Sequence, residues 1–168
     1  MNSKIQIGLD PSVNSFGIAI RRGDELELLC FNLFEAGQFL YKFLSENKDN
    51  VVKIVCEDNS SSANFHKSKN AGTARKTNQN IGKAQAAQIY VEQLCQSLDI
   101  KLDLVRNSSR DRIDKKGKKS LNTVNVQLLR YPTKTNREQF KLLLKTYGIT
   151  AKTLGNNDSR DAATLILY

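Results

Sequence analysis

Four acidic residues stand out because each one ends or opens a predicted element. Asp10 ends an apolar strand, Glu57 ends a second one, and Asp158 and Asp161 lie three residues apart at the start of a helix. Residues at that spacing share one helix face, with Cβ atoms about 5–6 Å apart. A simpler interpretation stays open for each acid. Asp10 can cap a turn, and two aspartates in a first helical turn favour the helix dipole.

The four acids become more informative as a set. In open sheets, ligands bind beyond the carboxyl ends of the strands. Four carboxylates that converge there repel one another unless cations occupy the site. Hard oxygen ligands suit Mg²⁺ or Mn²⁺, and two such ions about 3.5–4 Å apart form a clamp for in-line phosphodiester hydrolysis. The set therefore predicts a two-metal hydrolytic site.

The elements that would position these acids predict an α/β fold. Apolar alternation and short apolar runs predict strands at 5–10, 16–20, 25–34, 51–57 and 102–105. Helical spacing predicts helices at 35–47, 81–98, 121–129, 135–147 and 158–168. This order predicts a mixed five-stranded sheet flanked by helices, with a three-stranded antiparallel meander and two parallel strands. With no repeat or linker, residues 1–168 are expected to form one domain.

The composition favours a polyanionic partner. The 168 residues include 26 Lys or Arg against 17 Asp or Glu, a formal charge of +9, which favours nucleic acid over an acidic membrane surface. No apolar run reaches the roughly 20 residues that span a bilayer, and the first residues do not resemble a signal peptide. Cys30, Cys56 and Cys95 have neither disulfide nor zinc spacing. They are predicted to be buried thiols in a reducing compartment, the cytoplasm or nucleus.

Most of the positive charge lies between residues 59 and 119. This stretch holds thirteen Lys or Arg and five Asp or Glu, an excess of eight. Such runs are commonly only a solvated surface, but two polar loops at 58–80 and 106–119 would place them beside the acids, where they can contact phosphates. The single histidine, His66, is expected to be a loop residue or phosphate contact rather than a general base. The predicted nucleic-acid contacts are Phe65, Lys67, Lys69, Arg75, Lys76, Lys83, Arg110, Arg112, Lys115 and Lys116.

The acidic motifs resemble those of a known nuclease family. In order along nearly the whole chain, the segments 7–12 (Ile-Gly-Leu-Asp-Pro-Ser), 16–19 (Phe-Gly-Ile-Ala), 55–57 (Val-Cys-Glu) and 158–163 (Asp-Ser-Arg-Asp-Ala-Ala) resemble motifs of RuvC-type Holliday junction resolvases. These enzymes belong to the retroviral-integrase/RNase H superfamily. The resemblance implies an RNase H-like fold and two Mg²⁺ ions, with Mn²⁺ as a substitute. The catalytic metal ligands that it implies are Asp10, Glu57, Asp158 and Asp161.

The resemblance implies three further roles. Lys134 matches a basic residue that lies near the cleaved phosphate, and the helix near 80–87 matches one that helps to form a homodimer. Residues 81–98 carry apolar side chains on more than one face, which fits a dimer interface or, alternatively, a fully buried core helix. Phe65 is the nearest match to an aromatic residue that follows the second acid. We expect it to stack on an unpaired base at the crossover, unless it packs onto the domain.

The predicted function is a structure-selective endonuclease that makes paired nicks in four-way DNA junctions, as a homodimer without a small-molecule cofactor. The long loop after Glu57 and a stretch at 110–119 that looks like an insertion favour a divergent member, from a phage or mobile element. The host cytoplasm would then be its compartment. Alternatives are a nuclease of this fold acting on flaps, other branched DNA or RNA–DNA hybrids, and a non-catalytic junction-binding relative. A sugar-kinase or chaperone-ATPase fold would need a phosphate loop and a second domain, which are missing.

Overall fold

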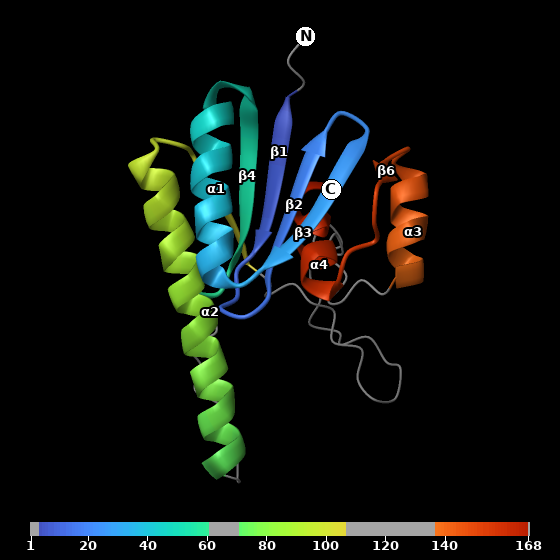
Figure 1. The fold of residues 1–168 in the computed structure, drawn as a ribbon. Coiled ribbons are helices and arrows are strands. Elements are labelled where there is room, and N and C mark those ends of the chain that lie inside the picture. Colours follow the sequence, from blue (N-terminus) through green and yellow to red (C-terminus); the bar gives the residue numbers. More distant parts are fainter. Residues whose placement is uncertain (1–3, 61–70, 107–136, 168) are drawn as a thin grey trace.

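The computed structural model describes residues 4–60, 71–106 and 137–167 (Figure 1). Within these residues, six strands form one sheet in the spatial order β5-β4-β1-β2-β3-β6. The strands are β1 (Ile5–Asp10), β2 (Phe16–Arg22), β3 (Glu25–Phe31), β4 (Val51–Asp58), β5 (Asp103–Arg106) and β6 (Thr150–Ala151). The helices are α1 (Leu33–Asn47), the short 3₁₀ helix η1 (Lys48–Asn50), α2 (Ala71–Ser97), α3 (Arg137–Thr146) and α4 (Asn157–Leu167).

The strand pairing confirms the predicted mixed sheet. β1, β2 and β3 form the antiparallel meander, while β4 pairs in parallel with β1 and β5 pairs in parallel with β4. The predicted count of five strands is wrong by one, because Thr150–Ala151 pairs in parallel with Glu25–Leu26 of β3. A strand of two residues is too short to show the alternation that reveals strands in a sequence.

Alternate side chains of the sheet enter two separate cores, one on each face. Ile7, Ile18 and Ile54 pack with α1 and α2 on the first face. Ala19 and Val55 pack with α3 and α4 on the second face. The sheet is therefore a central layer, and a strand residue's position in the alternation decides which helices it meets.

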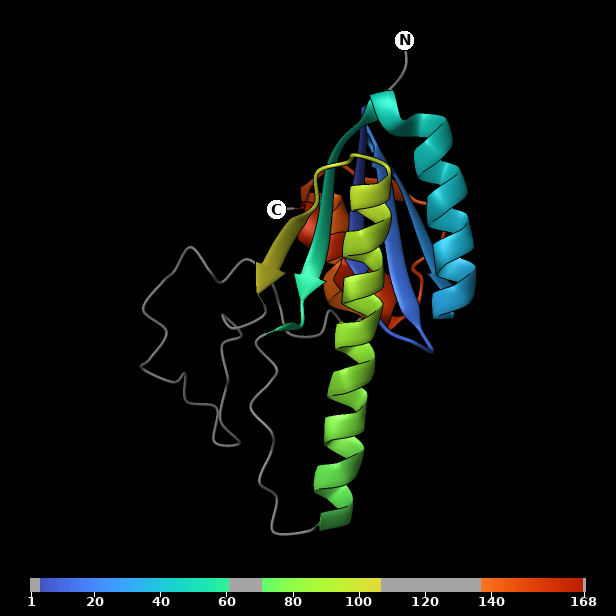
Figure 2. The same ribbon diagram turned by 90° about the vertical axis from the view of Figure 1, so that its left-hand side faces the viewer.

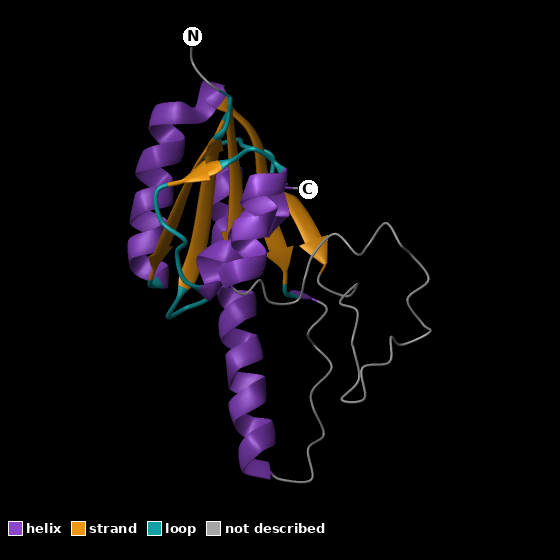
Figure 3. Ribbon diagram, turned by 90° about the vertical axis from the view of Figure 1, so that its right-hand side faces the viewer, coloured by secondary structure: helices purple, strands orange, loops and turns teal. Residues whose placement is uncertain are grey.

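The predicted start of the long helix at residue 81 is wrong, since α2 begins ten residues earlier, at Ala71. Residues 71–80 contain no large apolar side chain, so they carry no helical periodicity. They project beyond the carboxyl ends of the strands, as Figures 2 and 3 show. A segment that does not pack on the sheet needs no apolar face. The loop predicted for 58–80 consequently ends by residue 70.

Local signals set the other boundaries. α1 begins two residues earlier than predicted, at a capping box in which Asn32 accepts from the Glu35 amide and Glu35 accepts from the Asn32 amide. Gly148, with a φ of +63°, follows α3 in the left-handed conformation that commonly ends a helix. The helix predicted at 121–129 lies outside the described residues.

Among the described helices, none combines the length and apolar character needed to cross a membrane.

The three cysteines differ in exposure. Cys56 and Cys95 are buried free thiols, as predicted, but Cys30 is exposed, so the prediction is wrong for this residue. Cys30 lies near the end of β3, whereas β6 covers β3 only at Glu25 and Leu26. Within the residues that the structure describes, the end of β3 is thus an open sheet edge, a tertiary feature that the apolar sequence around Cys30 does not reveal.

Candidate active site

Asp10 is the last residue of β1, and Glu57 is the last but one residue of the adjacent parallel strand β4. The register pairs Gly8 with Val55 and Leu9 with Cys56, so the two acids follow next to each other at the same edge of the sheet. Gly8 and Val55 face α4. Since side chains alternate along a strand, Asp10 and Glu57, two residues further on, face α4 as well.

Two glycines let α4 lie directly on the strands that carry this edge. A Cβ atom at Gly8 would overlap the carbonyl oxygen of Ala162, and one at Gly17 would overlap the carbonyl oxygen of Asp158. Gly17 is also the residue that pairs with Asp10 across the β1–β2 hairpin. Because glycine has no side chain, the helix backbone can approach this closely, and the first turn of α4 arrives beside Asp10.

The helix cap of α4 is Asn156 and not one of the two aspartates. Its side chain accepts a hydrogen bond from the Ser159 amide at 2.9 Å, and the Ser159 hydroxyl accepts one from the Asn156 amide at 3.1 Å. This reciprocal cap satisfies amides that the start of a helix otherwise leaves without partners. Asp158 and Asp161 are therefore not needed as caps, although Asp158 in the first turn still favours the helix dipole.

The electrostatics show that the other three acids converge on Asp10. The pKa of Asp10 is raised from 3.8 to about 9, first because the carboxyl is desolvated by burial and then because Glu57 repels its charge. A hydrogen bond with Glu57 and the charges of Asp161 and Asp158 raise this pKa further. Desolvation and like charges both disfavour an ionised carboxyl, so the site favours a positive species next to Asp10: a proton or a cation.

The donor set fits a hard divalent cation in its chemistry, since all four side chains offer carboxylate oxygens. In the part of the chain that the structure describes, however, no group of three or more His, Cys, Asp or Glu side chains stands in a metal-binding arrangement. Charge interactions act over longer distances than metal–ligand bonds of about 2.0–2.6 Å. The carboxyls are close enough to shift the pKa of Asp10 without forming a finished ligand cage.

Sequence reasoning missed the polar residues that hold Asp158. The Ser15 hydroxyl, in the β1–β2 turn, donates a hydrogen bond to the Asp158 carboxylate. Asn156 Nδ2 lies 3.4 Å from Ser15 Oγ and 2.9 Å from Cys30 Sγ. The short polar side chains of this turn were the available signal in the sequence. The β1–β2 turn, the end of β3 and the start of α4 therefore form one polar cluster.

Arg160 is a further residue whose position sequence reasoning missed. It is buried, and it donates hydrogen bonds to the carbonyl oxygens of Leu154 at 3.0 Å and Gly155 at 2.8 Å. A third bond goes to the side chain of Asn157. Arg160 thus fixes the loop that leads into α4 and contributes to the position of Asp158 and Asp161 through the backbone.

The predicted nucleic-acid contacts fall into two groups. Arg75, Lys76 and Lys83 are exposed on α2, the first two on the segment that projects past the edge carrying the acids (Figure 2). The first acidic residue after Ser60 in the described chain is Glu92, so residues 71–91 of α2 carry positive charge only. The following predicted residues lie outside the described residues: Phe65, His66, Lys67, Lys69, Arg110, Arg112, Lys115, Lys116 and Lys134.

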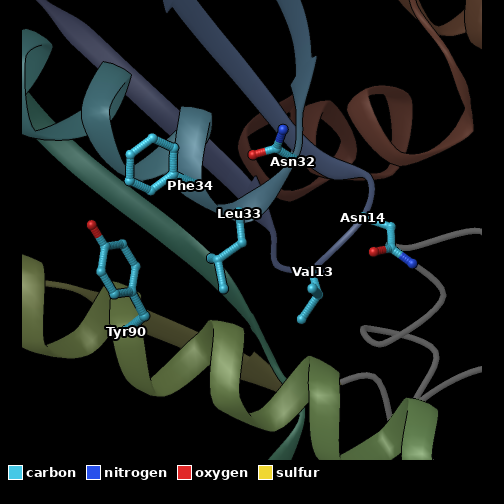
Figure 4. Close-up of a pocket in the computed structure, with 6 residues that line it drawn as sticks. All are labelled: Val13, Asn14, Asn32, Leu33, Phe34 and Tyr90. Carbon is cyan, nitrogen blue, oxygen red and sulfur yellow. The ribbon is translucent and has the colours of Figure 1, made fainter.

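A separate cavity of about 500 Å³ lies between the β1–β2 turn, the start of α1 and α2. Figure 4 shows Phe34 and Tyr90 at one end of it and Asn14 at the other. Val13, Asn32 and Leu33 complete the lining, which is mainly apolar. Its mainly apolar lining differs from the carboxylates of the acidic edge.

Comparisons with known proteins find a similar fold without similarity in sequence. No family model matches the chain, and no curated protein matches it. Among solved structures, RuvC of T. thermophilus in complex with a Holliday junction substrate matches with a TM-score of 0.53 at 9% identity, over 98% of this chain and 90% of that one. A second Thermus thermophilus RuvC structure matches with a TM-score of 0.48 at 10% identity, over 97% and 91% of the two chains. The chain therefore has a RuvC-like variant of the RNase H-like fold.

Proposed function

We propose that this chain is a structure-selective endonuclease that hydrolyses phosphodiester bonds in four-way DNA junctions with two divalent metal ions. The observation that carries the proposal is the convergence of Glu57, Asp158 and Asp161 on the buried Asp10 carboxyl, whose pKa is raised to about 9 first by desolvation and then by these three acids. The RuvC-like fold and the charge of +9 support it. The RuvC structure in complex with a Holliday junction gives the substrate class proposed for this chain.

In this mechanism the four carboxylates would hold Mg²⁺ or Mn²⁺, and Asp10 would be ionised in the metal-bound state. Ions bound there would supply the chemistry of two-metal hydrolysis, activation of a water molecule and neutralisation of charge on the leaving 3′ oxygen. Asn156 and Ser15 hold Asp158 in place, while Gly8 and Gly17 keep α4 against the strands. Lys134 has the role that the family resemblance implies, close to the cleaved phosphate.

Binding of the junction is assigned mainly to phosphate contacts. Arg75, Lys76 and Lys83 on α2 offer exposed positive charge beside the acidic edge. The basic residues predicted at 67–69 and 110–116 complete this surface in the proposal. Phe65 is proposed to stack on an unpaired base at the crossover, a contact worth about 1–3 kcal/mol per base.

Two symmetric nicks require two active sites, so the proposal includes a homodimer. Ile89 and Tyr90 on α2 are 53% and 40% exposed, which contradicts the alternative of a fully buried core helix. Phe34 and Tyr41 on α1 are exposed as well. These side chains form an apolar face on α1 and α2 that a second copy of the chain can cover.

The decisive experiment compares synthetic substrates in Mg²⁺: a four-way junction, a flap, an RNA–DNA hybrid and a linear duplex. Paired nicks in the junction, with slow or no cleavage of the linear duplex, are expected. Equal cleavage of every substrate would overturn the junction-selective function while leaving a nuclease. Faster cleavage of flaps or hybrids would identify one of the alternative substrates.

A variant tests the chemistry separately from binding. Asp10→Asn removes one charged ligand and keeps the shape of the side chain, so cleavage should fall to background while junction binding, measured by gel shift, stays close to that of the wild type. Cleavage near the wild-type rate would remove Asp10 from the site. Cleavage by the wild type in EDTA would exclude a role for divalent metal.

A further inference from the structure

The end of β4 is tied to α2 through one buried amide side chain, that of Gln88. Its Oε1 accepts a hydrogen bond from the Asn59 amide at 2.5 Å. Its Nε2 donates to Glu92 Oε1 at 2.7 Å and to Asp58 Oδ1 at 3.4 Å. Gln88 is only 4% exposed, and Asp58 is 7% exposed.

Gln88 bonds to Asp58, the residue next to Glu57, on the face of the sheet opposite to the one that Glu57 faces. Ile54 and Cys56 face α1 and α2, so by alternation Asp58 faces α2 while Glu57 faces α4. Asp58 Oδ1 also accepts a hydrogen bond from the Ser60 amide at 2.9 Å, which fixes the chain as it leaves the strand. The backbone that carries Glu57 is therefore held from one side while its carboxylate points to the other.

The chemistry of the link calls for an amide. The side chain at position 88 must accept from a backbone N–H and donate to two carboxylates, and glutamine offers both functions. A glutamate there would bring three carboxylates together inside the protein, and an apolar residue would leave Asp58 and the Asn59 amide without this partner. Gln85 adds a bond from the same helix, donating to the Asn59 carbonyl at 3.3 Å.

α2 is also the helix that carries the exposed cations of the proposed DNA surface, Arg75, Lys76 and Lys83. The helix that meets the substrate is thus bonded directly to the strand end that bears a proposed metal ligand. In Figure 2, α2 runs beside β4 and continues past its end.

We propose that Gln88 is a positioning residue for Glu57, which holds the end of β4 so that the Glu57 carboxylate can serve as a metal ligand. This role rests on the proposed function. Residues that orient metal ligands from outside the ligand shell typically change metal affinity or activity by about 10- to 100-fold when they are replaced.

The test uses the full chain and Mn²⁺ as the probe, with binding measured by isothermal titration calorimetry. Gln88→Met keeps the length of the side chain and removes its hydrogen bonds. We expect Mn²⁺ affinity and kcat on a four-way junction to fall by about 10- to 100-fold, with KM for the junction little changed. The matched control is Gln93→Met, the same replacement at an exposed position of the same helix, which should behave like the wild type.

Two results would overturn this role. If Gln88→Met melts at a lower temperature but binds Mn²⁺ and cleaves like the wild type while folded, Gln88 only packs the core. If Asp58→Asn loses Mn²⁺ binding as fully as Asp10→Asn does, Asp58 is itself a ligand, because the asparagine would keep the acceptor for Ser60 and Gln88.

Two further measurements separate the possible failures. Should Gln88→Met not fold, Gln85→Met removes a single bond of the same link from a half-buried position, and it should weaken Mn²⁺ binding in the same direction. Unchanged Mn²⁺ binding by a folded Gln85→Met would count against the link. A wild type that binds no Mn²⁺ would overturn the proposed function, and the role of Gln88 with it.

Discussion

Asp10 is a residue whose protonation depends on the fold. Its pKa is raised to about 9 by burial first and by the three neighbouring acids after that. Between its ordinary value of 3.8 and about 9, the folded protein holds a proton that the unfolded chain releases. Stability therefore falls as pH rises through this range, since the unfolded state binds fewer protons there.

This linkage gives a prediction for the metal-free protein. In EDTA, the melting temperature of the wild type should fall between pH 5 and pH 8.5, whereas Asp10→Asn should flatten this dependence and melt higher at pH 8. Each kcal/mol shifts the melting temperature by roughly 2–4 °C at this chain length. The difference is measured by circular dichroism at several pH values.

Asp49→Asn is the matched control, since Asp49 is exposed on η1 and its replacement should leave the pH dependence of the wild type intact. A variant Asp10→Asn that melts lower than the wild type at pH 8 would show that the acids do not repel one another as described. Adding Mn²⁺ should reverse the order of the two proteins, because only the wild type has the full set of ligands.

At the scale of elements, the packing of α4 on the sheet decides whether the acids meet. Gly17→Ala would place a methyl group against the backbone of Asp158 and Ser159, and neither strand nor helix has a flexible side chain there that could yield. We expect a loss of about 1–3 kcal/mol in stability, as for other overpacked sites. Cleavage at a temperature where the variant is folded should fall by about 100-fold, the effect of a displacement near 1 Å.

The chain offers a matched glycine for comparison. A Cβ atom at Gly82, within α2, meets nothing within 4 Å. Gly82→Ala should therefore raise the free energy of unfolding by about 0.5–1 kcal/mol, because alanine favours the helix, and it should leave cleavage unchanged. If Gly17→Ala cleaves normally while folded, the close contact between β2 and α4 does not set the geometry of the site.

The projecting half of α2 gives a prediction on DNA binding. Each phosphate contact that is lost lowers the slope of log K against log salt by about 0.9 on duplex DNA. Arg75→Ala with Lys76→Ala should lower this slope by about 1.8 and weaken junction binding at low salt. Lys145→Ala with Lys152→Ala removes the same charge from exposed positions outside α2, and binding isotherms at several salt concentrations should show little change. Equal effects of the two pairs would assign binding to net charge alone.

Elements that leave a local pattern in the sequence were predictable, and contacts between distant residues were not. The strand end at Asp10, and that of β4 to within one residue, at Asp58 in place of Glu57, were predictable because alternation and apolar runs stop there. The start of α2 was not predictable, because residues 71–80 form a helix that does not pack on the sheet. They therefore show no periodic apolar side chains. The hydrogen bonds from Ser15 to Asp158 and from Gln88 to Asp58 join residues far apart in the chain. The sequence around a polar residue does not identify its hydrogen-bond partner.

The whole molecule has two different surfaces on one sheet: an acidic edge at the carboxyl ends of β1 and β4, and an apolar face on α1 and α2. Phe34 is 74% exposed and Tyr41 is 57% exposed on this face, next to the cavity of about 500 Å³ that Phe34 and Tyr90 line. Large exposed apolar groups gathered on one face are typical of an interface, whereas scattered ones are ordinary surface. The face lies opposite α4, so a partner bound there would leave the acids open to DNA.

The homodimer prediction follows from this separation of surfaces. Phe34→Ser with Tyr41→Ser should convert a wild-type dimer into a monomer at micromolar concentration, as measured by sedimentation equilibrium. Because both side chains are exposed, the melting temperature of the monomer itself should change little. Leu142→Ser is the control, since Leu142 is 66% exposed on α3, on the other face of the sheet, and its replacement should keep the dimer. A dimer lost only with Leu142→Ser would move the interface to α3. A wild type that sediments as a monomer with and without a junction would contradict the homodimer. The second active site that paired nicks require would then be missing.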